Sequence, residues 1–368
     1  MVNKFSAPKV VFLVLNYNGL RSLGNDLFMF IDSVFTVRYP NYEVVIVDNA
    51  SSDGSYEELI NRYGGDALII RLNSNYGYAG GNELGFRKYV FMRGVPDYVV
   101  LINNDYKIRN PDFLIDIIRE MDKDEKVVMA QGINLSYGKD VIASAGHFIT
   151  NARGYPRGIG LRLNELPEVK SYISHPHGSC AIIKTRIIKY RPYIFIPHYF
   201  GYNEIAELGL YMWSHGFKSV FYPVVVGEHR SSSTFRSFSE LRAYLKIRNE
   251  LWMYREFSMS SLMLYLIPTF TAHTFTLMYR PLQGKRGALF TKAIIDGLRG
   301  RVPLKPGPLY PLIVVLKPFH SFIMSFPGAI KRKFLLKYVW DIEDIIIRLT
   351  VTDDMLKNSG MPFLIRLG

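Results

Sequence analysis

This sequence contains only one cysteine and neither of the two common nucleotide-binding loops. Its single cysteine, Cys180, cannot form a disulfide within the chain, so nothing argues for an oxidising compartment. No Gly-x-Gly-x-x-Gly turn follows the first predicted strand, and no Gly-Lys-Ser/Thr occurs, which excludes the usual dinucleotide-binding loop and the P-loop. An α/β nucleotide-binding protein without either loop must hold phosphates differently, and a metal ion on an acidic loop is the obvious means.

Acidic residues are scarce between residues 231 and 340, where 17 lysines and arginines stand against 4 acidic residues. Residues 1–230 hold 25 against 23 and residues 341–368 hold 3 against 5, so this one stretch accounts for the net charge of +13. It also contains Trp252 and Trp340. Basic, apolar segments with tryptophan suit an anionic membrane surface. Nucleic acid is a weaker interpretation because no nucleic-acid motif is present, and a solvated basic face is the remaining one.

No hydrophobic run is clean enough to be a clear membrane span, which needs about 20 predominantly apolar residues. The run Ser258–Tyr279 contains Pro268, and the run Leu309–Phe326 is broken by Lys317. We therefore expect helices that lie in the membrane interface, with a Gly/Pro-rich basic connector over Gln283–Pro311.

What the first 135 residues do contain is a regular alternation of strand and helix patterns. Runs rich in β-branched residues predict strands at Lys9–Leu15, Glu43–Asp48, Ala67–Leu72, Tyr98–Ile102 and Lys126–Gly132. Helical patterns lie between them at Arg21–Phe35, Ser55–Tyr63, Ala79–Met92 and Pro111–Met121. This alternation predicts an α/β fold with a mostly parallel sheet and helices on both faces, in which ligands bind at the carboxyl ends of the strands.

A possible metal-binding carboxylate follows the fourth predicted strand, in Asn103-Asn104-Asp105. Mg²⁺ or Mn²⁺ on a nucleotide diphosphate needs only one or two protein carboxylates, because phosphate oxygens and water complete its shell. An aspartate at a strand end is more often a turn or helix cap. We expect Asp105 on an exposed loop.

Two further polar clusters stand at strand ends. Asp48 ends the second strand and begins the run Asp48–Ser55, where helix capping explains Asp53 or Ser55 but does not require Asp48. The carboxylate of Asp48 is therefore free to accept hydrogen bonds from a base or a ribose hydroxyl. After the third strand, Asn75–Asn82 is a glycine-rich turn into a helix, which would let the backbone approach a ligand closely.

Taken in order, four motifs resemble those of glycosyltransferase family 2, in its rhamnosyltransferase-like branch. They read Asn16-Tyr17-Asn18-Gly19, Val47-Asp48-Asn49-Ala50-Ser51-Ser52-Asp53-Gly54-Ser55, Asn75-Tyr76-Gly77-Tyr78-Ala79-Gly80-Gly81-Asn82 and Leu101-Ile102-Asn103-Asn104-Asp105. The resemblance continues through Gly178–Ile183 and Leu208–Pro223 to Arg248-Asn249, about the first 250 residues.

The resemblance implies a GT-A fold and a divalent metal, Mn²⁺ or Mg²⁺. Asp105 would be the last residue of a D-x-D-like metal motif, and His229, after the last strand of the domain, is a candidate further ligand. The implied donor-binding residues are Asn16, Asn18, Asp48, Asn49, Gly80, Gly81, Asn82, Asn103 and Asn104. His175 and His177 stand in a proline-containing loop that could line the acceptor site, although a structural role is the more common one for such histidines.

One departure concerns the catalytic base. Family members usually carry Glu-Asp-x-Asp-Leu at the start of the acceptor-side helix, and an ungapped match places Ile205 where the catalytic aspartate belongs. Glu204 is adjacent and Glu207 lies three residues further on, on the same helical face. We favour Glu204 as the base, with Glu207 as the alternative.

These features predict a glycosyltransferase that moves a hexose or deoxyhexose from a nucleotide-diphosphate sugar to a hydroxyl of a glycan or polyprenyl-linked acceptor, with inversion. Its catalytic domain would span residues 1–235, with a donor half to about residue 132 and an acceptor half beyond it. Residues 236–368 would form a helical region, beginning with a helix over Ser239–Phe257, that seats the protein peripherally or monotopically on the cytoplasmic face of the cell membrane. The alternatives are a non-catalytic sugar-nucleotide-binding or scaffold protein, made plausible by Ile205, and a nucleotidyltransferase.

Overall fold

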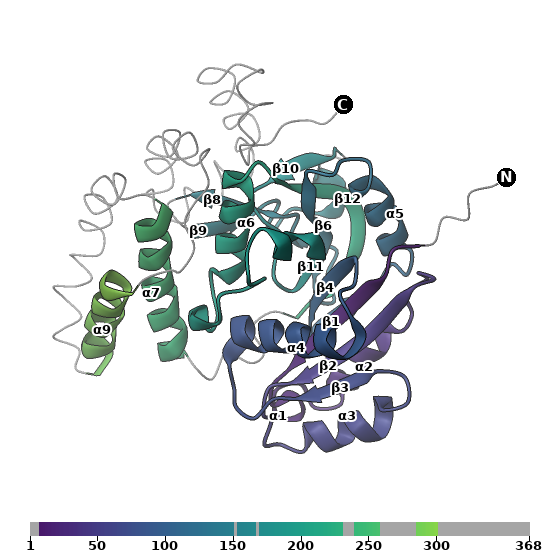
Figure 1. Ribbon diagram of the computed structural model, residues 1–368, viewed down its shortest axis with the longest axis horizontal. Helices are drawn as coiled ribbons and strands as arrows, with labels where there is room; N and C mark the ends of the chain where they lie inside the picture. Colours follow the sequence, from purple (N-terminus) through teal and green to yellow (C-terminus); the bar gives the residue numbers. More distant parts are fainter. Residues whose placement is uncertain (1–6, 151–152, 167–168, 231–238, 258–284, 301–368) are drawn as a thin grey trace.

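The structure is a computed structural model that describes residues 7–150, 153–166, 169–230, 239–257 and 285–300 (Figure 1). Its first part alternates strands and helices in the order expected. These elements are β1 (Val10–Asn16), α1 (Gly19–Leu23), α2 (Asp26–Val34), β2 (Tyr42–Asp48), α3 (Ser55–Tyr63), β3 (Leu68–Arg71), α4 (Gly77–Arg93) and β4 (Tyr98–Asn103). The single helix expected over Arg21–Phe35 is wrong: Gly24 takes a left-handed φ of 59° and separates α1 from α2.

Most of the elements that follow are shorter. They are β5 (Tyr106–Ile108), α5 (Phe113–Met121), β6 (Val127–Ser136), β7 (Ile142–Ser144), β8 (His147–Thr150), β9 (Arg153–Pro156), η1 (Leu163–Glu165), β10 (Ser171–Ile173), β11 (Cys180–Lys184), η2 (Thr185–Lys189), η3 (Pro197–Tyr199), α6 (Glu204–Ser214) and β12 (Lys218–His229). The longest of them are β6, α6 and β12. The three η elements are 3-10 helices.

One large sheet joins both parts of the domain, with the strand order β10-β12-β6-β11-β4-β1-β2-β3. Strands β3, β2, β1 and β4 are mutually parallel, as expected. The remainder is mixed, because β11 runs antiparallel to both β4 and β6 whereas β12 runs parallel to β6. Strands β6 and β12 thus run in the same direction as the first four strands, so the sheet is mixed but most of its strands share one direction, as expected.

The strand order places helices on both faces and defines where a ligand would bind. The chain moves outward from β1 to β2 and β3, and then returns past them to β4. Right-handed crossovers in opposite directions put α4 on the face opposite α1, α2 and α3. The order reverses between β1 and β4, and in such sheets the crevice beyond the carboxyl ends of the strands at this point receives the ligand. Asn16 and Asn103 end these two strands.

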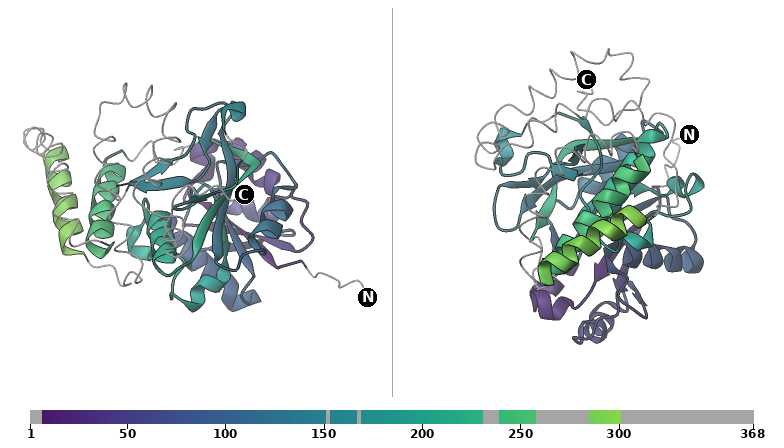
Figure 2. Two further views of the ribbon diagram at one scale, coloured as in Figure 1. Left: turned by 90° about the horizontal axis from the view of Figure 1, so that it is seen from above. Right: turned by 90° about the vertical axis from the view of Figure 1, so that its left-hand side faces the viewer.

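Two C-terminal helices, α7 (Ser239–Phe257) and α9 (Lys285–Arg299), lie side by side at one edge of the sheet domain (Figure 2). The predicted bounds of α7 are confirmed. The connector expected over Gln283–Pro311 is wrong in part, since α9 occupies its first half and packs on α7 through residues such as the buried Ala293. Within the described residues no helix combines the length and the apolar character that crossing a membrane requires. The runs Ser258–Tyr279 and Leu309–Phe326 lie outside those residues.

Candidate functional site

Asn16, at the end of β1, joins three of the four sequence motifs. Its side-chain amide donates to Asp48 Oδ1 (3.2 Å) and to Ser55 Oγ (3.0 Å), and its own Oδ1 accepts from Asn104 Nδ2 (2.9 Å). Asn16 is fully buried. The ends of β1, β2 and β4 are therefore held together by one hydrogen-bonded network, at the sheet edge where the strand order predicts a ligand.

Asp48 is fully buried at the centre of this network. Its Oδ2 accepts from the backbone N–H of Ser51 (3.0 Å) and lies 3.8 Å from Arg71 Nε, a residue the sequence reasoning did not single out. Both carboxylate oxygens thus have protein partners. A direct bond from Asp48 to a nucleoside stays a prediction, and such a bond would have to compete with Asn16 or Ser51.

The other asparagines of the motifs hold their own loops. Asn18 adopts a left-handed φ of 48° and its Oδ1 accepts from the Ser52 N–H (2.8 Å). Asn49 donates to Asn75 Oδ1 and to the Gly77 carbonyl, both at 3.0 Å. These bonds fix the shape of the loops that a donor would touch.

Gly80 and Gly81 of α4 lie where a side chain would collide with neighbouring protein atoms, a packing constraint that was not expected from the sequence. A Cβ on Gly81 would stand 2.7 Å from Leu15 Cδ1, and one on Gly80 would stand 2.8 Å from Tyr76 Cβ. The missing side chains therefore let α4 lie close to β1 and to its own first turn, and a contact of these glycines with a donor stays a prediction. Asn82, one turn into the helix, donates to the Tyr78 carbonyl (2.9 Å).

The structure brings Asp105 and His229 together, although they are far apart in the sequence. His229 ends β12, and its Nε2 lies 3.0 Å from Asp105 Oδ1 and 3.4 Å from Asn103 Nδ2. The expectation that Asp105 lies on an exposed loop is wrong, because only 5% of the residue is exposed. A carboxylate oxygen and an imidazole nitrogen at this separation are donors that Mn²⁺ or Mg²⁺ accepts, and diphosphate oxygens would supply the remainder of the shell. No group of three or more such side chains occurs among the described residues.

A row of histidines leads away from His229, and of its members His175 and His177 were named from the sequence whereas His147 was missed. The ring of His177 meets that of His229 edge-on at 5.4 Å, and His147 stacks on both His177 (5.1 Å) and His175 (4.9 Å). Burial lowers the pKa of His177 to about 3 and that of His175 to about 4. His175 and His177 are therefore neutral at pH 7, because burial disfavours the charged imidazolium.

Glu204 is the first residue of α6 and carries a buried carboxylate. Only 6% of the residue is exposed, and its Oε2 has no hydrogen-bond partner in the described structure. Burial raises the pKa of Glu204 to about 7. Tyr78 of the third motif lies near enough that Glu204 contributes, after burial, to raising the pKa of its hydroxyl. A buried carboxylate with a pKa near neutrality is suited to take a proton at physiological pH.

Glu207, the alternative candidate for the base, forms an ion pair inside the protein. It is fully buried, and its two oxygens accept from Arg191 Nη1 (3.1 Å) and Nη2 (2.9 Å). Arg191 is itself almost completely buried. This bidentate geometry is that of a structural ion pair, so of the two candidate bases Glu204 is the better placed.

We expect Glu207→Gln to destabilise the fold, because it would leave the Arg191 guanidinium buried without its counter-charge. Removal of one partner from a buried pair costs about 3–5 kcal/mol. Denaturant unfolding of Glu207→Gln, of Arg191→Met and of the double variant Arg191→Met with Glu207→Leu would measure this. The double variant should be more stable than the sum of the single effects predicts. Unfolding free energies equal to that of the wild type would contradict the structural role.

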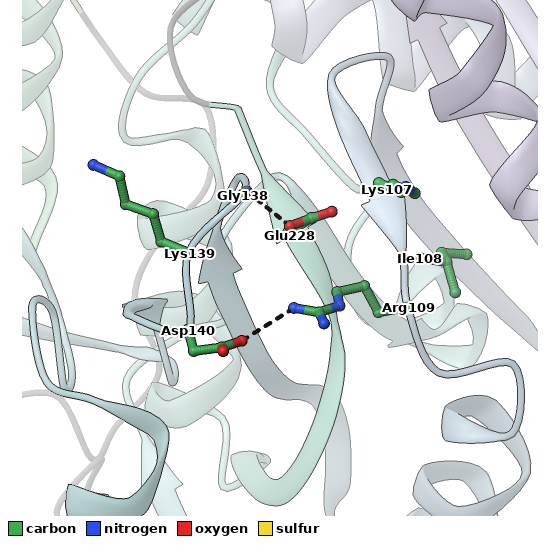
Figure 3. Close-up of a pocket in the computed structure, with 7 residues that line it drawn as sticks. All are labelled: Lys107, Ile108, Arg109, Gly138, Lys139, Asp140 and Glu228. Atoms are coloured by element: carbon green, nitrogen blue, oxygen red, sulfur yellow. Dashed lines mark hydrogen bonds and ion pairs between the residues drawn. The ribbon is translucent and has the colours of Figure 1, made fainter.

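A separate pocket of about 540 Å³ lies beside the β5–β12 ladder (Figure 3). Lys107 and Glu228 line it, and these two residues are register partners next to the Tyr106–His229 pair. Neither Asp105 nor His229 lines this pocket. The pocket therefore does not belong to the site.

Comparison with known proteins agrees with this geometry. Residues 13–191 match the family model described as glycosyl transferase family 2. No curated protein sequence matches the chain. The solved structure of GalNAc-T7, determined with UDP, GalNAc and Mn²⁺, shares the fold at low identity: it is 14% identical with a TM-score of 0.50, over 82% of this chain and 59% of that one. The mannosyltransferase PcManGT from Pyrobaculum calidifontis, in complex with GDP-Man and Mn²⁺, is 13% identical with a TM-score of 0.49, over 94% and 88%. S. aureus TarS 1-349 is 12% identical with a TM-score of 0.46, over 79% and 81%.

Residues 13–191, nearly half of the chain, are therefore similar to glycosyl transferase family 2, and the mixed α/β sheet is GT-A-like. The chain spans about three fifths of the length of GalNAc-T7. The rhamnosyltransferase-like branch stays a prediction.

Proposed function

We propose that the protein transfers a hexose or deoxyhexose, with inversion, from a nucleotide-diphosphate sugar to a hydroxyl of a glycan or polyprenyl-linked acceptor. The observation that carries this proposal is Glu204, a buried carboxylate with an unpaired oxygen and a pKa of about 7, in a domain that also brings Asp105 and His229 together. The Mn²⁺ in the GalNAc-T7 structure is in keeping with a metal requirement.

In the proposed reaction Glu204 accepts the proton of the acceptor hydroxyl while the hydroxyl oxygen attacks the anomeric carbon. The bond from that carbon to the diphosphate oxygen breaks, and the nucleotide diphosphate leaves. Asp105 and His229 would hold a divalent metal, which when bound stabilises the negative charge on the leaving diphosphate. The network around Asn16 keeps the ends of β1, β2 and β4 in fixed positions, so that donor and acceptor meet in line.

A screen of nucleotide sugars in the presence of Mn²⁺, first by thermal shift and then by donor hydrolysis, tests the proposal. A donor that binds the folded protein raises its melting temperature. Slow release of sugar to water by the wild type would support a transferase. Binding without any hydrolysis or transfer would favour the non-catalytic alternative, and release of pyrophosphate from a nucleoside triphosphate would favour a nucleotidyltransferase.

We further propose that residues 1–235 form the catalytic domain and that residues 236–368 seat it on the cytoplasmic face of the cell membrane. Helix α9 supports this, because its described surface combines cations with exposed apolar side chains. Ile295 is 39% exposed and Leu298 is 44% exposed, and Lys292 and Arg299 are exposed close to them on the helix. Side chains spaced three and four residues apart share a helical face, as an interfacial helix requires.

We expect binding to liposomes to rise with the content of anionic lipid and to weaken with salt, because lysine and arginine near such a surface contribute about 1 kcal/mol each and salt screens them. Co-sedimentation at low and high ionic strength would measure it. The paired substitution Ile295→Ser and Leu298→Ser should reduce binding, whereas Thr291→Ser, at an exposed position of the same helix, should not. A monodisperse, detergent-free protein that ignores anionic liposomes at low salt would contradict the membrane proposal.

A further inference from the structure

We propose that Asn249, assisted by Arg248, is a positioning residue that holds the loop before Glu204 and so places this carboxylate relative to the donor motif Asn75–Asn82. The inference rests on the proposed function, since it assigns Asn249 a task in the same reaction. Asn249 lies on α7, outside the residues matched by the family model.

The side-chain nitrogen of Asn249 is directed at this loop, while its Oδ1 accepts from Arg248 Nε (2.9 Å). Asn249 is fully buried, and its Nδ2 donates to the backbone carbonyls of Tyr199 (3.0 Å), Gly201 (2.8 Å) and Tyr202 (2.7 Å). Arg248 Nη2 adds bonds to the carbonyls of His198 and Tyr199, both at 2.9 Å. Because backbone carbonyls in a buried loop need donors, these two side chains supply what regular secondary structure would otherwise provide.

The loop needs such support because its backbone is strained. Phe200, Tyr202 and Asn203 have φ values of 62°, 69° and 70°, in the left-handed region that asparagine tolerates but aromatic residues rarely adopt. Strained residues of this kind persist only when their surroundings hold them, and they gather at functional sites. Asn203 is the residue before α6, so the shape of the loop sets where Glu204 begins the helix.

The same loop contacts the donor motif on its other side. The carbonyl of Phe200 accepts from the Ala79 N–H (3.1 Å), and a Cβ on Gly77 would stand only 2.1 Å from that oxygen. Gly77 is therefore confined to glycine by the loop as well as by its own φ of 69°. One strained segment thus links α7, the start of α4 and the proposed base, and Asn249 is its buried anchor.

The test compares Asn249→Asp, which keeps the shape but replaces the donating N–H groups by an oxygen, with Ala243→Ser at an exposed position of the same helix. In Asn249→Asp we expect kcat to fall by about 10²-fold, the cost of misplacing a reacting group by roughly 1 Å, with little change in the KM for the donor. The acidic limb of the pH–rate profile should move to lower pH, because a released Glu204 is better hydrated. Arg248→Lys, which keeps one donor, should be milder than Arg248→Ala, and Ala243→Ser should match the wild type.

Hydrogen exchange read by mass spectrometry provides a measurement that does not need turnover. Amides of residues 199–203 should exchange faster in Asn249→Asp while those of β1 and β2 keep the wild-type rate. Unchanged exchange in the loop, or an unchanged kcat and acidic limb in the folded variant, would overturn the inference. If Asn249→Asp does not fold, the same comparison is made between Arg248→Ala and Arg248→Lys, and equal loop exchange in those two variants would overturn it. Faster loop exchange in a protein that transfers no sugar would instead leave the loop anchor standing and reject the proposed function.

Discussion

Asp105→Asn should remove Mn²⁺-dependent nucleotide binding and reduce glycosyl transfer by a factor on the order of 10³ or more, because it deletes the carboxylate that lies beside His229 at the ligand-binding edge of the sheet. Asparagine keeps the shape and can still hydrogen-bond to His229, so the fold should persist although Asp105 is buried. Thermal shift with UDP or GDP, with and without Mn²⁺, measures the binding, and circular dichroism checks the fold.

A matched control for this substitution is Asp66→Asn. Asp66 is exposed just before β3, at the opposite end of the strands from Asp105. Asp66→Asn should leave both the Mn²⁺-dependent shift and the transfer rate as in the wild type. If Asp105→Asn retains the full Mn²⁺-dependent shift, Asp105 is not a metal ligand and the pairing with His229 has another purpose.

The sequence predicted most of the first half of the fold, because strand and helix patterns there depend on local periodicity. The bounds of α3, Ser55–Tyr63, and of α7, Ser239–Phe257, were predicted to the residue. The sequence also predicted correctly that the polar residues following β1, β2 and β4 lie together at the carboxyl ends of these strands. What local patterns could not predict was the antiparallel β11, because the direction of a strand depends on partners distant in the chain.

Within the site, the sequence predicted which residues gather but not what each one contacts. Glu204 and Glu207 are three residues apart on one helix, yet Arg191 neutralises only Glu207, through an ion pair that joins separate parts of the chain. Arg71 beside Asp48 and Asn249 beneath the loop before Glu204 were missed for the same reason. Their neighbours in space are not their neighbours in the sequence.

Glu204→Gln should lower kcat by about 10²-fold or more with little change in donor affinity, as removal of a general base does. In the wild type, kcat should rise with pH and level off above about 7, since burial raises the pKa of Glu204 to about 7 and only the ionised carboxylate accepts a proton. This rise of kcat with pH, the acidic limb of the pH–rate profile, should be absent from the residual activity of Glu204→Gln. Glu58→Gln, at an exposed position of α3, serves as the control and should keep both the rate and the limb.

Stability provides an independent measurement of the same carboxylate. Because the pKa of Glu204 is raised in the folded protein, the cost of ionising it is absent at acidic pH and appears as pH rises from the unfolded value of 4.5 towards 7. This difference corresponds to about 3 kcal/mol at alkaline pH. Glu204→Gln should therefore gain unfolding free energy over the wild type at pH 8 but not at pH 4, while its activity should fall below that of the wild type at pH 8, where Glu204 is ionised. If Glu204→Gln transfers sugar normally and a folded Glu207→Gln does not, the base lies one turn further along α6. Full activity in both variants would show that neither glutamate is the base.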